Sequence, residues 1–220
     1  MDVSHRLQLR VVDSSDELCN LKSSWDAILE KLDECPPFLT WEWMYTWWEV
    51  YKTDATKLLV LVISDKSNVV AIAPFYIRAS SYPISCKTVY FLGAGEPENK
   101  EVCSEYLDLI SIPSYSKAVS REVKSYFIRN YKIWDRIELY RILDTSVLRD
   151  CFVQDLLNMK YTVQNKKCGL RYFITLPDQW DKYIKSLKSS MRRSITVANK
   201  ILVCAVSGRY SCKRKKYSDK

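Results

Sequence analysis

Histidine and glycine are both scarce in this sequence: one histidine and four glycines occur among 220 residues. The histidine, His5, lies near the N-terminus, where we expect a surface residue, so catalytic schemes built on Ser/His/Asp or Cys/His are disfavoured. The glycines form neither Gly-x-Gly-x-x-Gly nor Gly-Lys-Ser/Thr, which argues against the common nucleotide-binding loops. Gly93 and Gly95 flank Ala94 after a predicted strand. They could present N–H groups to a phosphate, but we favour a tight turn.

Paired cysteines are absent as well. The sequence has eight cysteines and none of them lies in a Cys-x-x-Cys pair. Their scatter over predicted helices and strands is typical of buried free thiols. We therefore expect no zinc site and no other metal site.

No apolar run is long enough to cross a membrane. The longest candidates, Leu58–Ile63 and Val69–Ile77, are far shorter than the roughly 18 residues that a bilayer span requires. The first ten residues lack the apolar region of a signal peptide. These absences predict a cytoplasmic protein without a membrane span.

The positive charge is confined to one end of the chain. The whole sequence carries a formal charge of +8, but residues 181–220 hold twelve Lys/Arg and two Asp. The remaining 180 residues therefore have 22 basic and 24 acidic side chains, a net charge of −2. A polyanionic partner is expected at the C-terminal end only, and nucleic acid is disfavoured as a partner for the body of the protein.

Four of the seven tryptophans lie in Trp41–Tyr51, directly after a Pro-Pro pair. We predict a largely buried helix in which the Thr40 hydroxyl caps the first turn, with Leu39 and Met44 as a hydrophobic staple. A stacking platform for sugars or bases is the alternative, but aromatic residues at helical spacing favour a core. The polar strip of this helix is narrow and consists of Glu42, Thr46 and Glu49. We therefore interpret three of the tryptophans as structural: Trp43, Trp47 and Trp48.

Hydrophobic periodicity predicts an α/β protein with a mixed sheet. A strand at 5–12 is followed by a helix through residue 32, which starts at the capping box formed by Ser14 and Glu17. The runs 58–64 and 68–77 form a hairpin, in which Pro74 marks an edge or a bulge because it cannot donate to the ladder. Further strands are predicted at 87–92, 105–110, 134–140, 161–164 and 170–176, and further helices at 116–131 and 145–159.

Residues 177–203 predict one basic amphipathic helix, whose apolar stripe includes Trp180, Leu187, Met191 and Ile195. The last seventeen residues, Cys204–Lys220, show no period and form a basic tail. One interpretation of this tail is a frameshifted or truncated end.

Candidate site residues lie in the acidic stretch before residue 110. Most loop carboxylates are solvated, but Asp108 alternates with Leu107 and Leu109, which places it with Tyr106 on the face opposite the leucines. We predict a substrate-binding face formed by Glu105, Tyr106 and Asp108. The sequence identifies neither a catalytic base nor a cofactor-binding residue.

Several short sequence motifs, taken in their order along the chain, resemble the N-terminal part of the CelD-like acetyltransferases of the GNAT superfamily. They are Trp25; Pro37-Phe38; Trp43; Trp47-Trp48; Val69–Pro74; Phe91-Leu92-Gly93; Tyr106–Leu109; Trp134–Leu139; Leu176-Pro177; Trp180; and Tyr183. The resemblance covers about residues 9–200 and rests on the order of these motifs. It implies a GNAT-like domain at 1–176, with helices on both faces of a mostly antiparallel sheet. It also implies acetyl-CoA or another acyl-CoA as donor and an amine, hydroxyl or saccharide as acceptor, in a role linked to polysaccharide or cell-envelope synthesis.

The resemblance departs from the family pattern at the pyrophosphate loop. Members usually have two GNAT-like halves, and this chain stops about where the second half should begin. The Arg/Gln-x-x-Gly-x-Gly/Ala string is absent, and Ile112–Ser116 occupies the comparable place. The resemblance therefore implies that acyl-CoA binds mainly to a missing half, to which the helix at 177–203 would lead.

Two functional interpretations remain open. The first is an acyltransferase of which this chain is the N-terminal half. That half would contribute an acceptor-binding face, with or without activity of its own. The second is a non-catalytic domain that binds a protein or a polyanion through the basic helix and tail.

Overall fold

The computed structural model describes residues 7–80, 85–143, 145–146, 148–149, 161–166 and 174–206. The chain divides into two compact units, Met1–Cys168 and Gly169–Lys220. Among the described residues, the first unit contains the sheet and four α-helices, and the second contains two α-helices.

The described strands of the first unit form one six-stranded mixed sheet with the order β1-β2-β3-β4-β6, and β5 pairs with β3 beside that path. All pairs are antiparallel except β4 with β6, which is parallel. The predicted α/β class with a mostly antiparallel sheet is thus confirmed. The strands are β1 (Leu7–Val12), β2 (Thr56–Asp65), β3 (Asn68–Ser80), β4 (Cys86–Phe91), β5 (Ile110–Ser111) and β6 (Arg136–Ile137).

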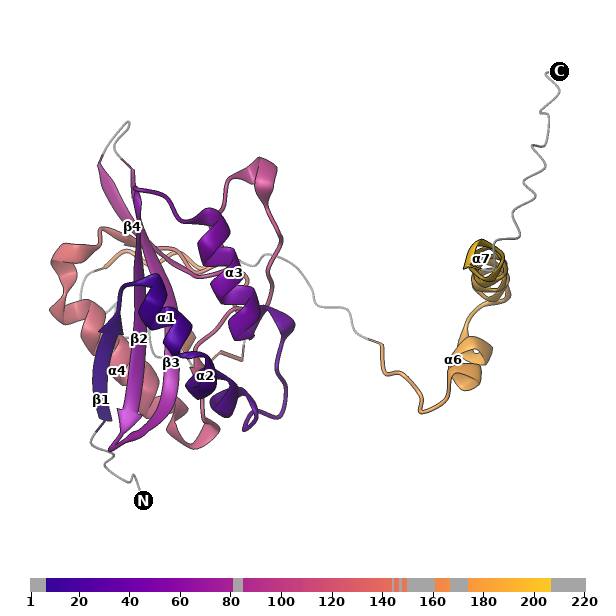
Figure 1. Ribbon diagram of the computed structural model, residues 1–220, viewed down its shortest axis with the longest axis horizontal. Helices are drawn as coiled ribbons and strands as arrows, with labels where there is room; N and C mark the ends of the chain where they lie inside the picture. The colour runs from indigo at the N-terminus through magenta and orange to yellow at the C-terminus, as the bar shows by residue number, and fades with distance from the viewer. Residues whose placement is uncertain are drawn as a thin grey trace. The chain divides into compact units, whose positions relative to one another are not determined.

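Helices cover both faces of this sheet, as predicted (Figure 1). Successive side chains of a strand point to opposite faces, and β3 shows this at two adjacent residues. Phe75 stacks on Phe91 and meets Phe127 of α4 edge-on, whereas Tyr76 packs against Trp47 and Trp48 of α3. The helices of this unit are α1 (Ser15–Asn20), α2 (Lys22–Leu29), α3 (Trp41–Tyr51) and α4 (Ser116–Arg129), with short 3-10 turns η1 (Pro37–Leu39), η2 (Glu98–Lys100), η3 (Pro113–Tyr115) and η4 (Tyr131–Ile133).

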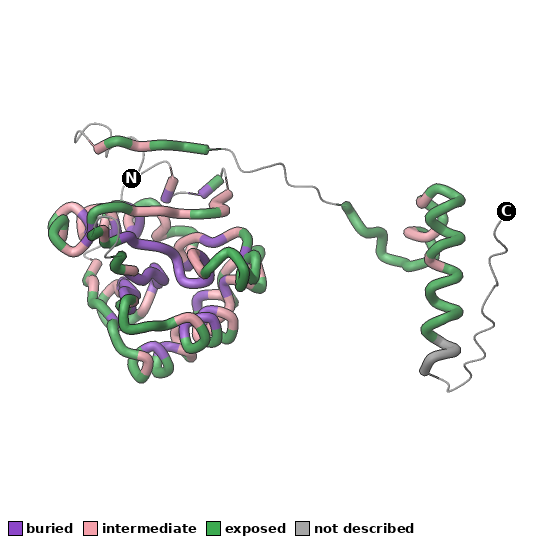
Figure 2. The backbone as a smooth tube through the Cα atoms, turned by 90° about the horizontal axis from the view of Figure 1, so that it is seen from above, coloured by how far each residue is buried: buried purple, intermediate pink, exposed green. Residues whose placement is uncertain are grey.

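The core lies where both helix layers meet the central strands (Figure 2). Six consecutive residues of β2 and eight consecutive residues of β3 are buried, because these strands are covered on both faces. The predicted hairpin is confirmed. It turns at Lys66-Ser67, where Lys66 adopts a positive φ of 55°, and the register shifts between Ile63 and Ser64.

The first predicted helix is split in two. The Ser14 hydroxyl caps α1 by accepting from the Glu17 N–H at 3.3 Å, as predicted. The helix ends at Asn20, and α2 begins after Leu21 and ends at Leu29, so Leu32 lies outside it. The predicted apolar positions Leu18, Leu21, Trp25 and Ile28 are nevertheless buried, because the break keeps them on the same side.

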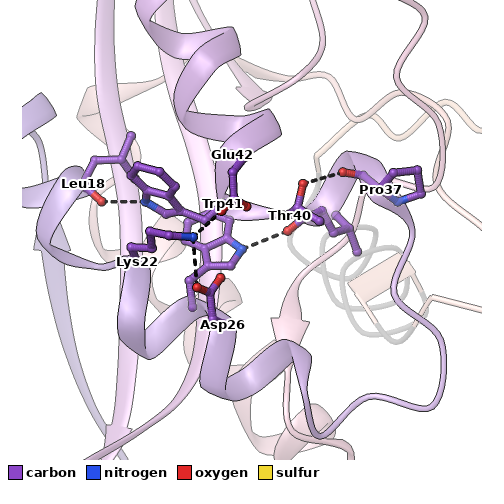
Figure 3. Close-up of polar contacts among 9 residues, drawn as sticks. Leu18, Lys22, Asp26, Pro37, Thr40, Trp41 and Glu42 are labelled. Carbon is purple, nitrogen blue, oxygen red and sulfur yellow. Dashed lines mark hydrogen bonds and ion pairs between the residues drawn. The ribbon is translucent and has the colours of Figure 1, made fainter.

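The aromatic helix is present, but its cap differs from the prediction (Figure 3). Thr40 has the extended backbone of an N-cap, but its hydroxyl donates to the Pro37 carbonyl at 2.7 Å and accepts no helical N–H. The preceding η1 turn leaves the Pro37 carbonyl within reach and diverts the hydroxyl. Other bonds anchor this end of the helix: the Trp41 indole donates to Leu18 O, and Lys22 pairs with Asp26 and Glu42.

Pro74 lies in an inner strand and not at an edge or a bulge, which corrects the prediction. On one side of β3, Ala71 and Ile72 pair with β5, and pairing with β4 begins at Phe75. The Pro74 carbonyl accepts from Leu92 N at 2.8 Å, so the nitrogen of Pro74 faces the same side. A proline is tolerated here because the ladder changes partner at this residue.

Three predicted strands are much shorter or are absent. Residues 105–109 are irregular, and β5 begins only at Ile110, because Tyr106 adopts a positive φ of 61°. The predicted strand at 134–140 is reduced to the two residues of β6. Residues 161–164 have no regular structure, and the helix at 145–159 and most of the strand at 170–176 lie outside the described residues.

In the second unit, the single helix predicted at 177–203 is two helices, α6 (Trp180–Ser186) and α7 (Ser189–Val206). Leu187 has an extended backbone with ψ 154°, which ends α6. Several apolar residues of this unit are exposed: Ile174, Leu176, Trp180, Met191, Val197, Ile201 and Leu202.

The cysteines only partly match the prediction of buried free thiols. Four described cysteines are free, but Cys19, Cys35 and Cys103 are exposed and Cys86 is half-buried. The exposed ones lie in a short helix and in loops at the surface, so their scatter in the sequence does not indicate a place in the core.

We predict that Trp47→Ala lowers the free energy of unfolding by about 3–5 kcal/mol, because the side chain is 5% exposed and packs on Tyr51 and Tyr76. Trp43→Ala should cost less, because Trp43 is half-buried. Val50→Ala is the matched control on the same helix, since Val50 is 66% exposed. Urea denaturation measures all three. An unchanged midpoint for the Trp47 variant would contradict the assignment of this helix to the core.

Candidate active site

The parallel pair β4 and β6 separates before β4 ends. Thr88 lies opposite Arg136, Val89 lies opposite Ile137, and the Glu138 N–H donates to the Val89 carbonyl at 2.9 Å. The next rung of a parallel ladder would be the Phe91 N–H donating to the Glu138 carbonyl. That bond is not formed in the part of the chain that the structure describes. We call this place the strand fork, formed by Phe91 on one side and by Glu138 and Tyr140 on the other.

The Phe91 N–H points into the strand fork. Leu92 N donates to Pro74 on β3, and N–H groups alternate between the two sides of a strand, so the Phe91 N–H faces the side of β6. Phe91 is fully buried. Unpaired N–H groups in buried residues are rare and require an explanation, a functional role being one.

The chain leaves β4 through the Gly93-Ala94-Gly95 turn. The Ala94 N–H donates to the Phe91 carbonyl at 3.3 Å, and both glycines have positive φ, 89° and 86°. A Cβ at Gly95 would lie 2.7 Å from the Tyr76 hydroxyl oxygen, so only glycine fits without displacing that side chain. The geometry is that of the tight turn favoured by the sequence.

Two side chains from β3 donate hydrogen bonds to the carbonyls of this turn. The Tyr76 hydroxyl donates to Ala94 O at 2.8 Å, and the Arg78 guanidinium donates to Gly95 O. Arg78 also lies over the Tyr90 ring, 4.6 Å from its centroid, and donates to the Tyr90 hydroxyl at 2.9 Å. Burial raises the pKa of Tyr76, which therefore stays neutral and can donate to the carbonyl.

On the other side of the turn lies the segment that the sequence singled out. The Trp43 indole donates to the Ser104 hydroxyl at 3.0 Å, and a Cβ at Gly93 would touch Ser104 and Leu107. Glu105 is exposed and Tyr106 is half-buried. Because Tyr106 has positive φ, the strand alternation that placed Tyr106 and Asp108 on one face does not hold.

Asp108 follows Leu107, whose side chain lies next to Gly93 in the turn after β4. The Ser146 hydroxyl and the Leu109 N–H both donate to Asp108 Oδ1, each at 2.8 Å. Among the described residues, Oδ2 has no hydrogen-bond donor. Burial raises the pKa of Asp108, although these two hydrogen bonds act in the opposite direction.

The carboxylate at the strand fork, that of Glu138, was missed by the sequence reasoning. Arg136 donates to Glu138 Oε1 at 2.9 Å, and the Tyr140 hydroxyl donates to Oε2. Burial acts to raise the pKa of Glu138, but hydrogen bonds from Tyr140, Arg136 and Tyr90 outweigh it and the pKa is lowered. Burial, and then the bond to Glu138, raise the pKa of Tyr140. The alternation of Arg136, Glu138 and Tyr140 was the available signal.

The described residues contain no group of three or more His, Cys, Asp or Glu side chains arranged to hold a metal ion. None of the helices within the described ranges is long and apolar enough to cross a membrane.

No protein-family model matches the chain, and no curated protein matches its sequence. Among solved structures, an aminoglycoside acetyltransferase from an uncultured soil metagenomic sample, in complex with trehalose, matches 79% of this chain and 100% of that chain, at 12% identity and a TM-score of 0.39. Its complex with sisomicin gives the same values. An acetyltransferase of Trypanosoma brucei matches 76% of this chain and 99% of that chain, at 15% identity and a TM-score of 0.39.

The raised pKa of Asp108 predicts a pH-dependent effect of Asp108→Asn on stability. Below the unfolded-state pKa of about 3.9 both states are protonated and the variant should match the wild type. As the pH rises above that value, the unfolded state ionises more readily than the folded state, so the wild type loses stability relative to the neutral variant. Asparagine keeps an oxygen that can accept from Ser146 and Leu109.

Urea denaturation of wild type and variant between pH 4 and pH 8 tests this prediction, with the exposed Glu98→Gln as control. Equal stability across the range, or a variant that is less stable at pH 7, would mean that the Asp108 carboxylate is not destabilised by burial.

Proposed function

We propose that this protein transfers an acyl group from acyl-CoA to an amine or hydroxyl acceptor at the strand fork. The observation that carries the proposal is the buried Phe91 N–H, which the separation of β4 and β6 leaves without an acceptor among the described residues. A thioester carbonyl is an acceptor whose oxygen becomes more negative during attack. A fixed N–H is worth most where such charge develops in a water-poor site.

Asp108 is the general base in this proposal. A carboxyl whose pKa is raised is a stronger base than an ordinary aspartate, and the two bonds to Oδ1 fix its orientation. The acceptor nitrogen or oxygen bonds to the thioester carbon while its proton passes to Asp108 Oδ2. The carbon–sulfur bond then breaks and the CoA thiolate takes up a proton. Glu105 and Tyr106, on the same segment, remain candidates for contacts with the acceptor.

The resemblance to CelD-like acetyltransferases supports this proposal independently, and it adds a saccharide as one acceptor class and a role in polysaccharide or cell-envelope synthesis. The sequence has no glycine-rich pyrophosphate loop, so we expect the donor to bind weakly. The KM for acetyl-CoA should be about 1 mM or higher, at the upper end of the range usual for enzymes. Donor contacts outside this chain would account for such weakness.

The test measures thiol release from acetyl-CoA by the full chain at millimolar donor. The acceptor panel contains a diamine, an aminosugar and a neutral sugar. Asp108→Asn should lower kcat by about 10²–10⁴, while Glu98→Gln should leave it unchanged. The wild-type rate should rise with pH through the raised pKa of Asp108. If no acceptor stimulates thiol release, or if the Asp108 variant keeps full activity, this function is wrong.

A second candidate function is binding to an acidic polymer or protein through the second unit. Between Lys182 and Val206 the chain has six basic residues and no acidic one. Trp180, Met191 and Leu202 are more than half exposed in the same unit. Exposed cations beside apolar side chains are typical of a binding surface for an acidic partner.

We predict that this surface binds dextran sulfate with an affinity that falls steeply as salt is raised, because the attraction is between charges. The double variant Arg192→Gln/Arg193→Gln should weaken binding, and Lys57→Gln on β2 should not. Fluorescence titration at three salt concentrations measures this. Binding that is insensitive to both salt and the double variant would rule out an electrostatic surface on α7.

A further inference from the structure

Side chains that follow β6 make polar contacts at the strand fork. After donating its N–H to Val89, Glu138 makes no further rung with β4 among the described residues. Its carboxylate instead accepts from Arg136 and Tyr140, which lie two residues before and two residues after it. Residues two apart lie on the same face of an extended chain, so these bonds link three side chains along one face of the segment.

An aromatic stack attaches the same segment to the face of the sheet. The Tyr140 ring is stacked on Tyr90 at a centroid distance of 6.1 Å, and Tyr90 is stacked on Tyr76 at 5.5 Å. Arg78 lies over Tyr90 and fixes its hydroxyl. The stack thus joins β3, β4 and the segment after β6 through side chains, at the level where the backbone ladder has ended.

The backbone turns away from β4 directly after this contact. Arg141 has a positive φ of 57°, a conformation that is uncommon for residues other than glycine and that persists only where the surroundings impose it. Its guanidinium lies 3.8 Å from Glu101 Oε1. The turn therefore follows Tyr140, which stacks on Tyr90, and its Arg141 side chain pairs with Glu101.

We propose that Glu138, Tyr140 and Tyr90 are positioning residues that keep the strand fork open, so that the Phe91 N–H stays available to a ligand carbonyl. This inference rests on the proposed function for its catalytic consequence, but its structural part can be tested without any activity. These three side chains act through the backbone of Glu138. If the ladder continued, the Glu138 carbonyl would accept the hydrogen bond from the Phe91 N–H.

The test compares Tyr140→Phe with the wild type by amide hydrogen exchange in the full chain. In the wild type, the Phe91 amide should exchange faster than that of Val89, which lies in the paired part of β4. The variant keeps the ring stack but loses the bond to Glu138, which frees residues 138–140 to continue the ladder. Protection of Phe91 should then increase about tenfold. Tyr131→Phe is the matched control, because Tyr131 is 58% exposed.

Glu138→Gln is a second variant for the case that Tyr140→Phe does not fold, and it should also increase protection of Phe91. In the acyl-transfer assay both variants should lower kcat and leave the KM for the donor nearly unchanged. Unchanged exchange at Phe91 in both variants, or equal exchange of Phe91 and Val89 in the wild type, would overturn the inference. Increased protection in a chain that never transfers an acyl group would support the positioning role and refute the proposed function.

Discussion

The arrangement of the first unit depends on how the hydrogen bonds along one side of β3 are shared. β4 takes the later half of that side and β5 takes the earlier half, and they meet at Pro74, where β3 has no N–H to offer. This sharing brings the end of β4 and the segment before β5 to one place. The Gly93 turn after β4 and the side chain of Leu107, which precedes Asp108, lie next to each other for this reason.

Features set by local chemistry were predictable from the sequence, and features set by long-range register were not. The Ser14 cap, the hairpin at Lys66-Ser67 and the aromatic helix follow from turn chemistry and helical periodicity. The strand expected at 105–110 fails because the positive φ of Tyr106 interrupts an alternation that looks regular in the sequence. The strand fork exists because the hydrogen bond from the Phe91 N–H to the Glu138 carbonyl is not formed. No local sequence pattern predicts where the pairing of two distant strands ends.

The two carboxylates near the end of β4 show why residue type alone does not assign a role. Asp108 accepts two hydrogen bonds on one oxygen, and burial dominates, so its pKa is raised. Glu138 is also penalised by burial, but it accepts from Tyr140, Arg136 and Tyr90, and its pKa is lowered. A group that gains a proton readily suits a base, whereas a group held ionised suits an anchor for neighbouring donors. The sequence singled out Asp108 for its alternation with leucines, which is not the physical reason that distinguishes it.

The open strand fork lowers the stability of the fold. A buried N–H without an acceptor destabilises the fold by about 1–3 kcal/mol, and a residue other than glycine at positive φ costs a similar amount. Both features border the fork in the described part of the chain, at Phe91 and Arg141. Closing the fork would remove the first cost by forming one backbone hydrogen bond. The stack of Tyr76, Tyr90 and Tyr140 and the bonds to Glu138 must therefore offset more than that bond would contribute, which is expected where the open state serves a purpose other than stability.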